Sequence, residues 1–224
     1  MCGILGLYSQ NACQYDEVKN KFDLAKEIGK HRGPDGYGFF NNESQNIFLA
    51  HHRLSIIDPT SSSNQPMMDD NEENIMIFNG EIYNYKELRE ELIKENKFEF
   101  KTNSDSEVLL KFFISNLKKD NFDFLNKLRG IFAALIYSKS LNKIFIFNDR
   151  FAVKPLYIYE NEKYSLFGSE IKSFIPFIDK KLNININSIK NYLIYIYAPG
   201  DYTPVNEITS MPPGSILTID TNSN

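Results

Sequence analysis

The sequence is poor in the residues that build metal centres and disulfide frameworks. Its 224 residues include two cysteines, three histidines and no tryptophan. Neither a Cys-x-x-Cys nor a His-Glu-x-x-His spacing occurs, so no metal site is expected. Cys2 and Cys13 could form at most one bridge, and this sparse usage favours a reducing compartment in which both are free thiols.

An excess of charge of one sign and long apolar runs are missing as well. The chain has 25 basic and 29 acidic residues, a formal net charge of -4, and its basic residues are spread out. This balance gives no reason to expect nucleic acid or an acidic membrane as a partner. No apolar run approaches the roughly 20 residues that cross a bilayer, and the first residues do not have the pattern of a signal peptide. We therefore expect a cytoplasmic protein.

The length is sufficient for one sizeable hydrophobic core, and a single domain over 1–224 is expected. Short apolar runs predict strands, and apolar residues at helical spacing predict helices. Strands are predicted over 2–8, 37–40, 47–57, 75–79, 131–137, 143–148, 156–159, 164–167 and 215–220, and helices over 15–30, 84–95, 105–117 and 187–196. The strands are apolar on both faces and alternate with helices, which indicates an α+β protein with covered sheets.

Cys2 would become the N-terminal residue if Met1 were removed, as happens when the second residue is small. It would then carry both a thiol and a free α-amino group, whose reference pKa is roughly 7.7–8.0. Such an amine can take the thiol proton and act as a general base, and a thiolate is a competent nucleophile. By position alone, a small buried strand residue is the commoner interpretation, because free cysteines are often buried.

Three motifs in order along the chain decide between these interpretations. They are Cys-Gly-Ile-Leu-Gly at 2–6, His-Arg-Gly-Pro-Asp at 31–35 and Asn-Gly-Glu-Ile-Tyr-Asn at 79–84. The set resembles class II glutamine amidotransferases, which are N-terminal-nucleophile hydrolases, and is most similar to the glutaminase domain of glutamine-dependent asparagine synthetases. The related sugar-phosphate enzymes usually have Tyr-Asp-Ser in the second motif. Further similarity runs through 52–58, 65–67, 102–107, 149–157, 169–172 and 192–214.

This resemblance implies a fold and a reaction. The fold is a four-layer αββα sandwich with two antiparallel sheets. The reaction is hydrolysis of glutamine to glutamate and ammonia through a γ-glutamyl thioester on Cys2. In asparagine synthetases, a second domain uses ATP and Mg to make asparagine from aspartate with this ammonia. The Ser-Gly-Gly-x-Asp-Ser phosphate loop of that domain does not occur in this sequence, so no cofactor is expected for this chain. The expected partners are glutamine and a C-terminal or separate synthetase domain, with a homodimer as a further option.

The resemblance also assigns residues to the two ends of the substrate. Arg53 matches the arginine that holds the α-carboxylate, and a guanidinium fork suits this task. Its plainer interpretation is a surface arginine at a strand end. Asp105 matches the acid that holds the α-ammonium, with Glu81 beside it. Asp105 could also be the N-cap of the helix predicted over 105–117, a position for which Ser104 is the other candidate. Glu81 could be a solvated loop carboxylate. The backbone wall next to Arg53 is implied to consist of Leu54, Ser55, Ile56 and Ile57.

Asn79 and Gly80 match the oxyanion hole of the family. The Asn79 side-chain amide and the Gly80 backbone N–H would both donate to the oxygen that becomes negative during attack. The plainer interpretation is an Asn-Gly hairpin turn, although a helix is predicted soon after. Arg32, Gly33 and Asp35 are expected to shape the loop beside the nucleophile. Ala152 stands where the family commonly has glycine, and alanine resists positive φ.

Three other functions fit parts of the same pattern. The ammonia could serve a different acceptor, such as a sugar or another carboxylate. The chain could be a catalytically silent glutamine-binding module, which the intact nucleophile and oxyanion residues argue against. It could also be an N-terminal-nucleophile peptidase, but an Arg53 and Asp105 pair suits a free amino acid better than a peptide.

Overall fold

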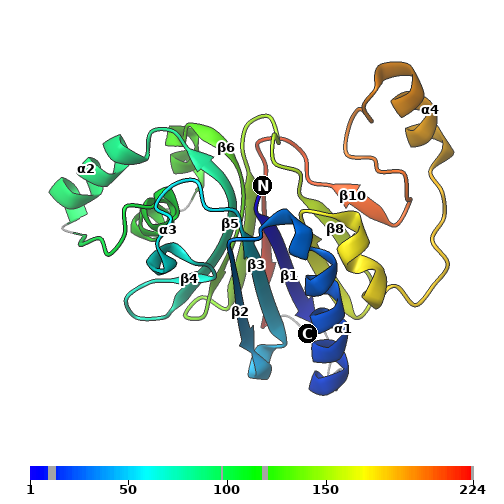
Figure 1. The fold of residues 1–224 in the computed structure, drawn as a ribbon, viewed down its shortest axis with the longest axis horizontal. Helices are drawn as coiled ribbons and strands as arrows, with labels where there is room; N and C mark the ends of the chain where they lie inside the picture. Colours follow the sequence, from blue (N-terminus) through cyan, green and yellow to red (C-terminus); the bar gives the residue numbers. More distant parts are fainter. Residues whose placement is uncertain (10–13, 97, 118–120, 223–224) are drawn as a thin grey trace.

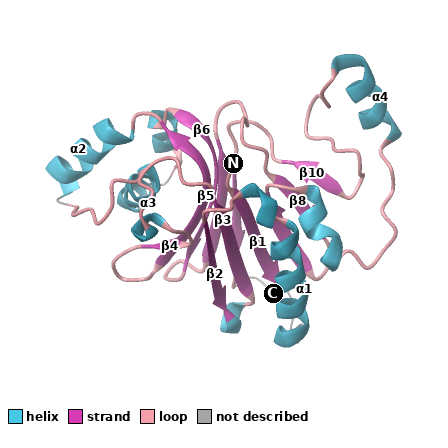
Figure 2. Cartoon of the chain, viewed as in Figure 1, coloured by secondary structure: helices cyan, strands magenta, loops and turns pink. Residues whose placement is uncertain are grey.

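A computed structural model describes residues 1–9, 14–96, 98–117 and 121–222; Cys13, expected to be a free thiol, lies outside these ranges. The chain forms two antiparallel sheets with helices on their outer sides (Figure 1). Figure 2 shows strands concentrated in the centre and helices at the periphery. The expected α+β fold with a four-layer αββα arrangement is confirmed.

The first sheet has six strands in the order β10-β8-β9-β1-β3-β2, and the second has five in the order β11-β7-β6-β5-β4. All of the strand pairs are antiparallel. The strands are β1 (Gly3–Ser9), β2 (Gly36–Asn42), β3 (Ile47–Arg53), β4 (Met67–Met68), β5 (Asn74–Ile82), β6 (Gly130–Ser138), β7 (Lys143–Asn148), β8 (Tyr157–Glu160), β9 (Tyr164–Gly168), β10 (Ile208–Ser210) and β11 (Ile216–Asp220).

Four α-helices are described: α1 (Tyr15–Ile28), α2 (Tyr85–Asn96), α3 (Asp105–Asn116) and α4 (Ile186–Tyr195). Short 3-10 segments are η1 (Lys30–Arg32), η2 (Glu43–Gln45), η3 (Ser61–Ser63), η4 (Asp123–Lys127) and η5 (Ile171–Phe177). None of the described helices is long and apolar enough to cross a membrane. In the part of the chain that is described, no group of three His, Cys, Asp or Glu side chains could hold a metal ion.

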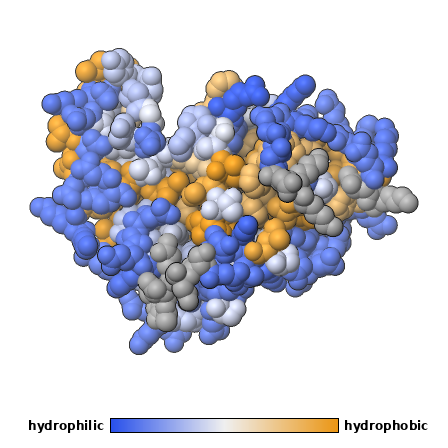
Figure 3. Space-filling view, turned by 180° about the vertical axis from the view of Figure 1, so that it is seen from behind, coloured by the Kyte–Doolittle hydropathy of each residue, from blue (hydrophilic) through white to orange (hydrophobic). Residues whose placement is uncertain are grey.

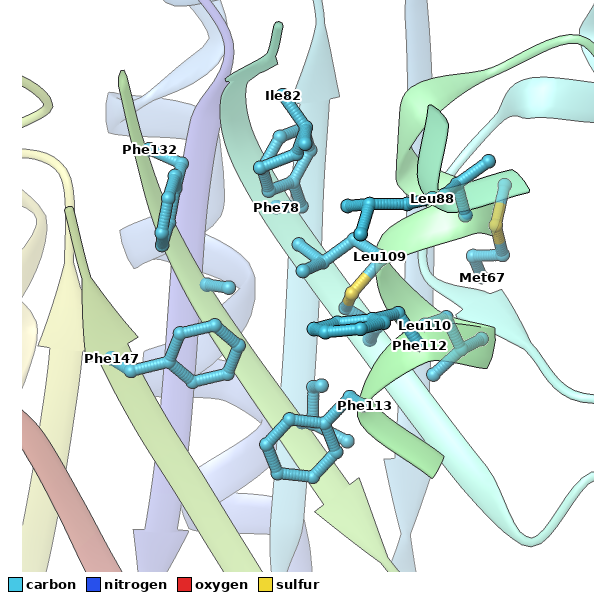
Figure 4. Packing of buried hydrophobic residues seen from close by; sticks show 14 of the residues in the cluster. Met67, Phe78, Ile82, Leu88, Leu109, Leu110, Phe112, Phe113, Phe132 and Phe147 are labelled. Atoms are coloured by element: carbon cyan, nitrogen blue, oxygen red, sulfur yellow. The ribbon is translucent and has the colours of Figure 1, made fainter. Parts of the chain in front are cut away.

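Three hydrophobic clusters account for the four layers, because each cluster fills one interface between layers. The central cluster joins the inner faces of the two sheets and includes Ile4, Leu49 and Leu135. A second cluster joins α1 and η5 to the six-stranded sheet. The third joins α2 and α3 to the five-stranded sheet, and Figure 4 shows Phe113 of α3 beside Phe147 of β7.

Helix α4 differs from the others because it projects from the body of the molecule (Figure 1). Its turns leave large apolar side chains in solvent, with Leu193 at 76% and Ile194 at 70% exposure. Figure 3 shows hydrophobic atoms on this projecting lobe from behind. Monomeric surfaces seldom present such a group of apolar side chains without an interaction partner.

Some predicted boundaries were wrong, and the site explains the most important one. The strand predicted over 47–57 ends at Arg53. Beyond it, the amide of Leu54 donates to the Cys2 sulfur and the amide of Ser55 donates to the Asp35 carboxylate. Strand β5 continues to Ile82 and therefore contains the Asn-Gly pair. The helix predicted over 15–30 stops at Ile28, and the short strands β4 and β10 were not predicted.

Candidate active site

Cys2 lies immediately before β1, which runs between β3 and β9 in the six-stranded sheet (Figure 1). Its backbone carbonyl accepts a hydrogen bond of 3.0 Å from Nε of Arg32. Its sulfur accepts one of 3.3 Å from the amide of Leu54 and lies 3.5 Å from the Leu54 carbonyl oxygen. The residue is therefore fastened on both its backbone and its side chain, at one end of a sheet.

The thiol of Cys2 experiences opposing electrostatic effects. Burial disfavours the charged thiolate and raises the pKa of the Cys2 thiol above its ordinary value. The Leu54 amide and three positive charges, those of the Met1 α-ammonium, Arg53 and Lys154, act in the opposite direction. A nucleophilic thiolate at neutral pH thus depends on these positive charges and on a nearby base.

The two predicted oxyanion residues lie within β5, so the hairpin-turn interpretation of Asn79 and Gly80 is wrong. Their neighbours show which way the strand faces. The Phe78 amide donates to Oε1 of Gln65 at 2.6 Å, and the Ile82 amide donates to Oδ2 of Asp105 at 2.9 Å. Because amides of alternate strand residues point to the same edge, the Gly80 N–H points to that edge as well, away from β6.

His51 supports this orientation from the neighbouring sheet. Its Nε2 lies 3.0 Å from the carbonyl oxygen of Phe78, on the same edge of β5. Complete burial lowers the pKa of His51 to about 3, so the ring stays neutral and donates from Nε2. The backbone N–H and C=O of Phe78 are therefore bonded to the side chains of Gln65 and His51. The backbone N–H of Gly80 lies on the same edge of β5, between these contacts and the contact of Ile82 with Asp105.

Asn79 has an unusual environment for a buried amide. The residue is 1% exposed, and its Nδ2 has no hydrogen-bond partner among the described residues. Leaving a buried donor unbonded costs free energy, so native structures contain few such groups. Gly80 next to it is required by packing, because a Cβ there would collide with the Ile131 carbonyl oxygen on β6.

Arg53 is buried at 6% exposure, so it is not a surface arginine. Its Nη1 donates to the Thr60 carbonyl at 2.7 Å and to the Asn64 side chain at 3.0 Å. Its Nη2 donates to the carbonyls of Ile57, at 3.4 Å, and Asp58. All four Nη hydrogens are therefore directed at the 57–64 segment, which wraps around the guanidinium.

Asp105 and Glu81 form an acidic end of the site. Asp105 is the first residue of α3, while the N-cap is Ser104, so the N-cap interpretation of Asp105 is wrong. Its carboxylate is held by the Ile82 amide, and the residue is 5% exposed. Burial, with the nearby charge of Glu81, raises the pKa of Asp105. Two acids close together favour a cation between them.

One pocket of about 80 Å³ joins these groups. It brings together nine of the ten predicted site residues, and Ser55 is the one that does not line it. The predicted residues in the lining are Cys2, Arg53, Leu54, Ile56, Ile57, Asn79, Gly80, Glu81 and Asp105. The pocket also has lining residues to which sequence reasoning gave no part in binding or catalysis, among them Gln65, Ser104, Ser106 and Lys154. All four lie in stretches that match the family, at 65–67, 102–107 and 149–157, which was the available signal.

The loop predicted to shape the nucleophile's surroundings does so through specific contacts. Nη1 of Arg32 donates to Glu170 at 3.0 Å, and His31 and Lys172 also contact that carboxylate. At Gly33, any side chain would collide with the backbone of His52. Asp35 holds the Ser55 amide at 2.8 Å. The segment from Arg32 to Asp35 therefore connects β1, β3 and the wall of the pocket.

This arrangement was compared with known proteins. A solved structure of glutamine phosphoribosylpyrophosphate amidotransferase from Bacillus subtilis, complexed with ADP and GMP, matches with a TM-score of 0.57 at 20% identity, over 78% of this chain and 43% of that one. The fold is accordingly that of the N-terminal-nucleophile hydrolases.

The family model of the glutamine amidotransferase domain matches residues 1–224. The chain belongs to the class II glutamine amidotransferases and is homologous to the glutaminase domains of asparagine synthetases. It is 34% identical to "Asparagine synthetase [glutamine-hydrolyzing] 1" of Bacillus subtilis, over 98% of this chain and 33% of that protein. It is also 34% identical to a putative asparagine synthetase of Methanocaldococcus jannaschii, over 91% of this chain and 41% of the relative. The chain thus spans about a third to two fifths of these relatives.

Proposed function

We propose that this chain hydrolyses glutamine to glutamate and ammonia, with Cys2 as the nucleophile. The observation that carries the proposal is the single pocket that joins a partly buried thiol, an unbonded buried amide at Asn79 and a pair of acids. Glutamine presents a side-chain amide at one end and an α-ammonium at the other. The thiol and the Asn79 amide suit the first, and Asp105 with Glu81 suits the second.

The first half of the reaction forms a thioester. After removal of Met1, the free α-amine of Cys2 takes the thiol proton, and the sulfur attacks the side-chain carbonyl carbon of glutamine. The carbonyl oxygen becomes negative and accepts hydrogen bonds from Nδ2 of Asn79 and the N–H of Gly80. When the intermediate collapses, the C–N bond breaks, the Cys2 ammonium returns its proton to the leaving nitrogen, and ammonia departs.

The second half releases glutamate. A water molecule gives a proton to the Cys2 amine and attacks the thioester carbon, and the same two donors stabilise the second oxyanion. The C–S bond then breaks, glutamate leaves, and the sulfur recovers the proton. The Cys2 amine carries the proton in every transfer, so the proposed reaction requires no histidine.

Arg53 is the proposed partner of the α-carboxylate, but its present bonds impose a condition. Because both Nη groups donate to the 57–64 segment, a carboxylate must displace some of those carbonyl oxygens. We therefore expect this segment to shift when glutamine binds. Hydrogen exchange of the amides in 57–64, measured with and without glutamine in Cys2→Ser protein, would detect the shift.

The decisive test combines glutamate release with chemical trapping. Wild type should release glutamate and ammonia in equal amounts, and Cys2→Ala should release neither. A glutamine analogue with an electrophilic ketone in place of the amide should add its mass to Cys2, as located by mass spectrometry. Glutaminase activity in Cys2→Ala, or an adduct on another residue, would disprove the assignment. Glutamine binding by mature protein without release would instead indicate a silent binding module.

Maturation gives a second readout of the same mechanism. A retained Met1 would convert the Cys2 amine into an amide and remove the base. Intact mass measurement should therefore show that active protein lacks Met1. Active protein that retains Met1 would contradict the role of the amine.

The acceptor of the ammonia is proposed to be an ATP-dependent unit that makes asparagine from aspartate. The homology with asparagine synthetases supports this, and the exposed apolar surface on α4 offers such a unit a place to dock. The reading frame beyond residue 224, or a neighbouring gene, should then encode a Ser-Gly-Gly-x-Asp-Ser phosphate loop. A unit with the site of a sugar or another carboxylate would favour a different acceptor.

A further inference from the structure

Lys154 is a charged lining residue of the active-site pocket to which neither the resemblance nor the proposed mechanism gives a role. It follows β7, in the connection to β8. Its side chain has no ion pair or hydrogen bond within the described ranges, although Cys2 and Asp105 line the same pocket. The residue is neither fully buried nor fully exposed.

The backbone around Lys154 is held firmly even though its side chain is not bonded. Asp149, which is 3% exposed, accepts hydrogen bonds on its carboxylate from the amides of Phe132, Phe151 and Val153, at 2.9 to 3.0 Å. On the other side, Leu156 is 1% exposed and its carbonyl accepts the Met211 amide at 2.8 Å. The ammonium is therefore carried on an anchored segment at the pocket wall.

The two cationic side chains of the pocket, Arg53 and Lys154, differ in their hydrogen-bond partners. Arg53 directs its Nη hydrogens at the carbonyls of Ile57, Asp58 and Thr60 and at Asn64. The Lys154 side chain has no such hydrogen bond within the described part of the chain. Both line the same pocket as Cys2, and the positive charge of each acts to lower the pKa of the Cys2 thiol. The ammonium of Lys154 can therefore interact with negative charge that develops in the pocket during the reaction.

We propose that Lys154 is a positioning residue that provides a positive charge in the pocket that Cys2 lines, stabilising the thiolate and the oxyanion formed when it attacks. Its importance for turnover rests on the proposed glutaminase function, whereas its effect on the thiol does not. The acids of the pocket, Asp105 and Glu81, are proposed to hold the substrate ammonium instead. The α-amine of Cys2 remains the proton carrier, and Lys154 gives up no proton.

The experiment measures the rate at which iodoacetamide alkylates Cys2 as a function of pH. Mature protein with Cys13→Ser is used, so that Cys2 is the only thiol. Lys154→Met should shift the pH midpoint of alkylation upward and lower the rate near pH 7 about three- to tenfold, the size expected for loss of one nearby charge. Lys154→Arg should restore most of the rate. Lys180→Met, which removes an exposed lysine on another segment, is the matched control.

Glutamine kinetics and unfolding curves separate the remaining outcomes. Lys154→Met should lower kcat more than it raises KM, with an unfolding midpoint close to that of wild type. An unshifted alkylation midpoint would overturn the proposal, and a rise in KM alone would make Lys154 a ligand of the substrate instead. If the midpoint shifts but wild type releases no glutamate, the role of Lys154 stands and the proposed function fails.

Discussion

Replacement of Asn79 by alanine should separate catalysis from stability more clearly than any other change in the pocket. Nδ2 of this residue is buried and unbonded among the described residues. An unsatisfied buried donor costs about 1–3 kcal/mol, so removal of the amide eliminates that cost while it opens a small cavity. We expect the free energy of unfolding of Asn79→Ala to stay within about 1 kcal/mol of wild type.

Turnover should respond very differently. If Nδ2 of Asn79 donates to the oxyanion, its loss lowers kcat by about 10²–10³, equivalent to roughly 2.7–4 kcal/mol in the barrier. KM should change little, because the bond forms mainly in the transition state. Glutamate release under saturating glutamine gives kcat, and urea unfolding in the absence of glutamine gives stability.

Asn148 provides a matched control at the end of β7. It is 6% exposed, its Nδ2 donates to the Pro212 carbonyl at 2.9 Å, and its Oδ1 accepts the Ser215 amide at 3.1 Å. Asn148→Ala leaves bonded partners unsatisfied and should cost about 1–3 kcal/mol of stability, with kcat per folded molecule preserved. The explanation is refuted if Asn79→Ala retains more than about a tenth of wild-type kcat, or if it destabilises the protein as much as Asn148→Ala.

Three further outcomes follow from individual residues. Ala152 has a φ of 50°, so Ala152→Gly should stabilise the protein by roughly 0.5–1 kcal/mol in urea unfolding. Burial acts to raise the pKa of Glu170, but its hydrogen bonds, first of all the one from Arg32, lower this pKa overall. The stability that the ionised Glu170 contributes should be complete above about pH 4.3 and should be lost as the pH falls through the lowered pKa. Glu170→Gln protein should not show this loss. Because burial and Glu81 raise the pKa of Asp105, KM for glutamine should begin to rise on acidification at a higher pH than for an ordinary aspartate, and Glu81→Gln should bring that pH down. An identical KM profile in the two proteins would contradict this.

Much of the fold could be predicted from local sequence pattern. Apolar runs predicted most of the strands, and helical spacing predicted α1 to α4 within a few residues, because burial on one face imposes these periods. The two-residue β4 and three-residue β10 were missed, since segments this short carry no detectable period. The sheet order, in which β1 lies between β3 and β9, has no local signal at all.

The candidate site shows the same division. Position two pointed to Cys2, and the family resemblance of the ordered motifs selected Arg53, Asn79 and Asp105, whose residue types suit the roles that the resemblance implies. The error at 54–57, predicted as a strand, has a tertiary origin: the amides of Leu54 and Ser55 bond to Cys2 and Asp35, which come from distant segments.

The sequence by itself therefore determined the chemical groups available to this protein and the family to which their order belongs. Only the tertiary structure decided which of them are free to act. It directs the Arg53 guanidinium at loop carbonyls, leaves the Asn79 amide unbonded within the described chain, and brings Lys154 into the pocket that Cys2 lines. Those outcomes depend on contacts between strands and loops far apart in the chain, and residue type cannot specify which donors such contacts will use.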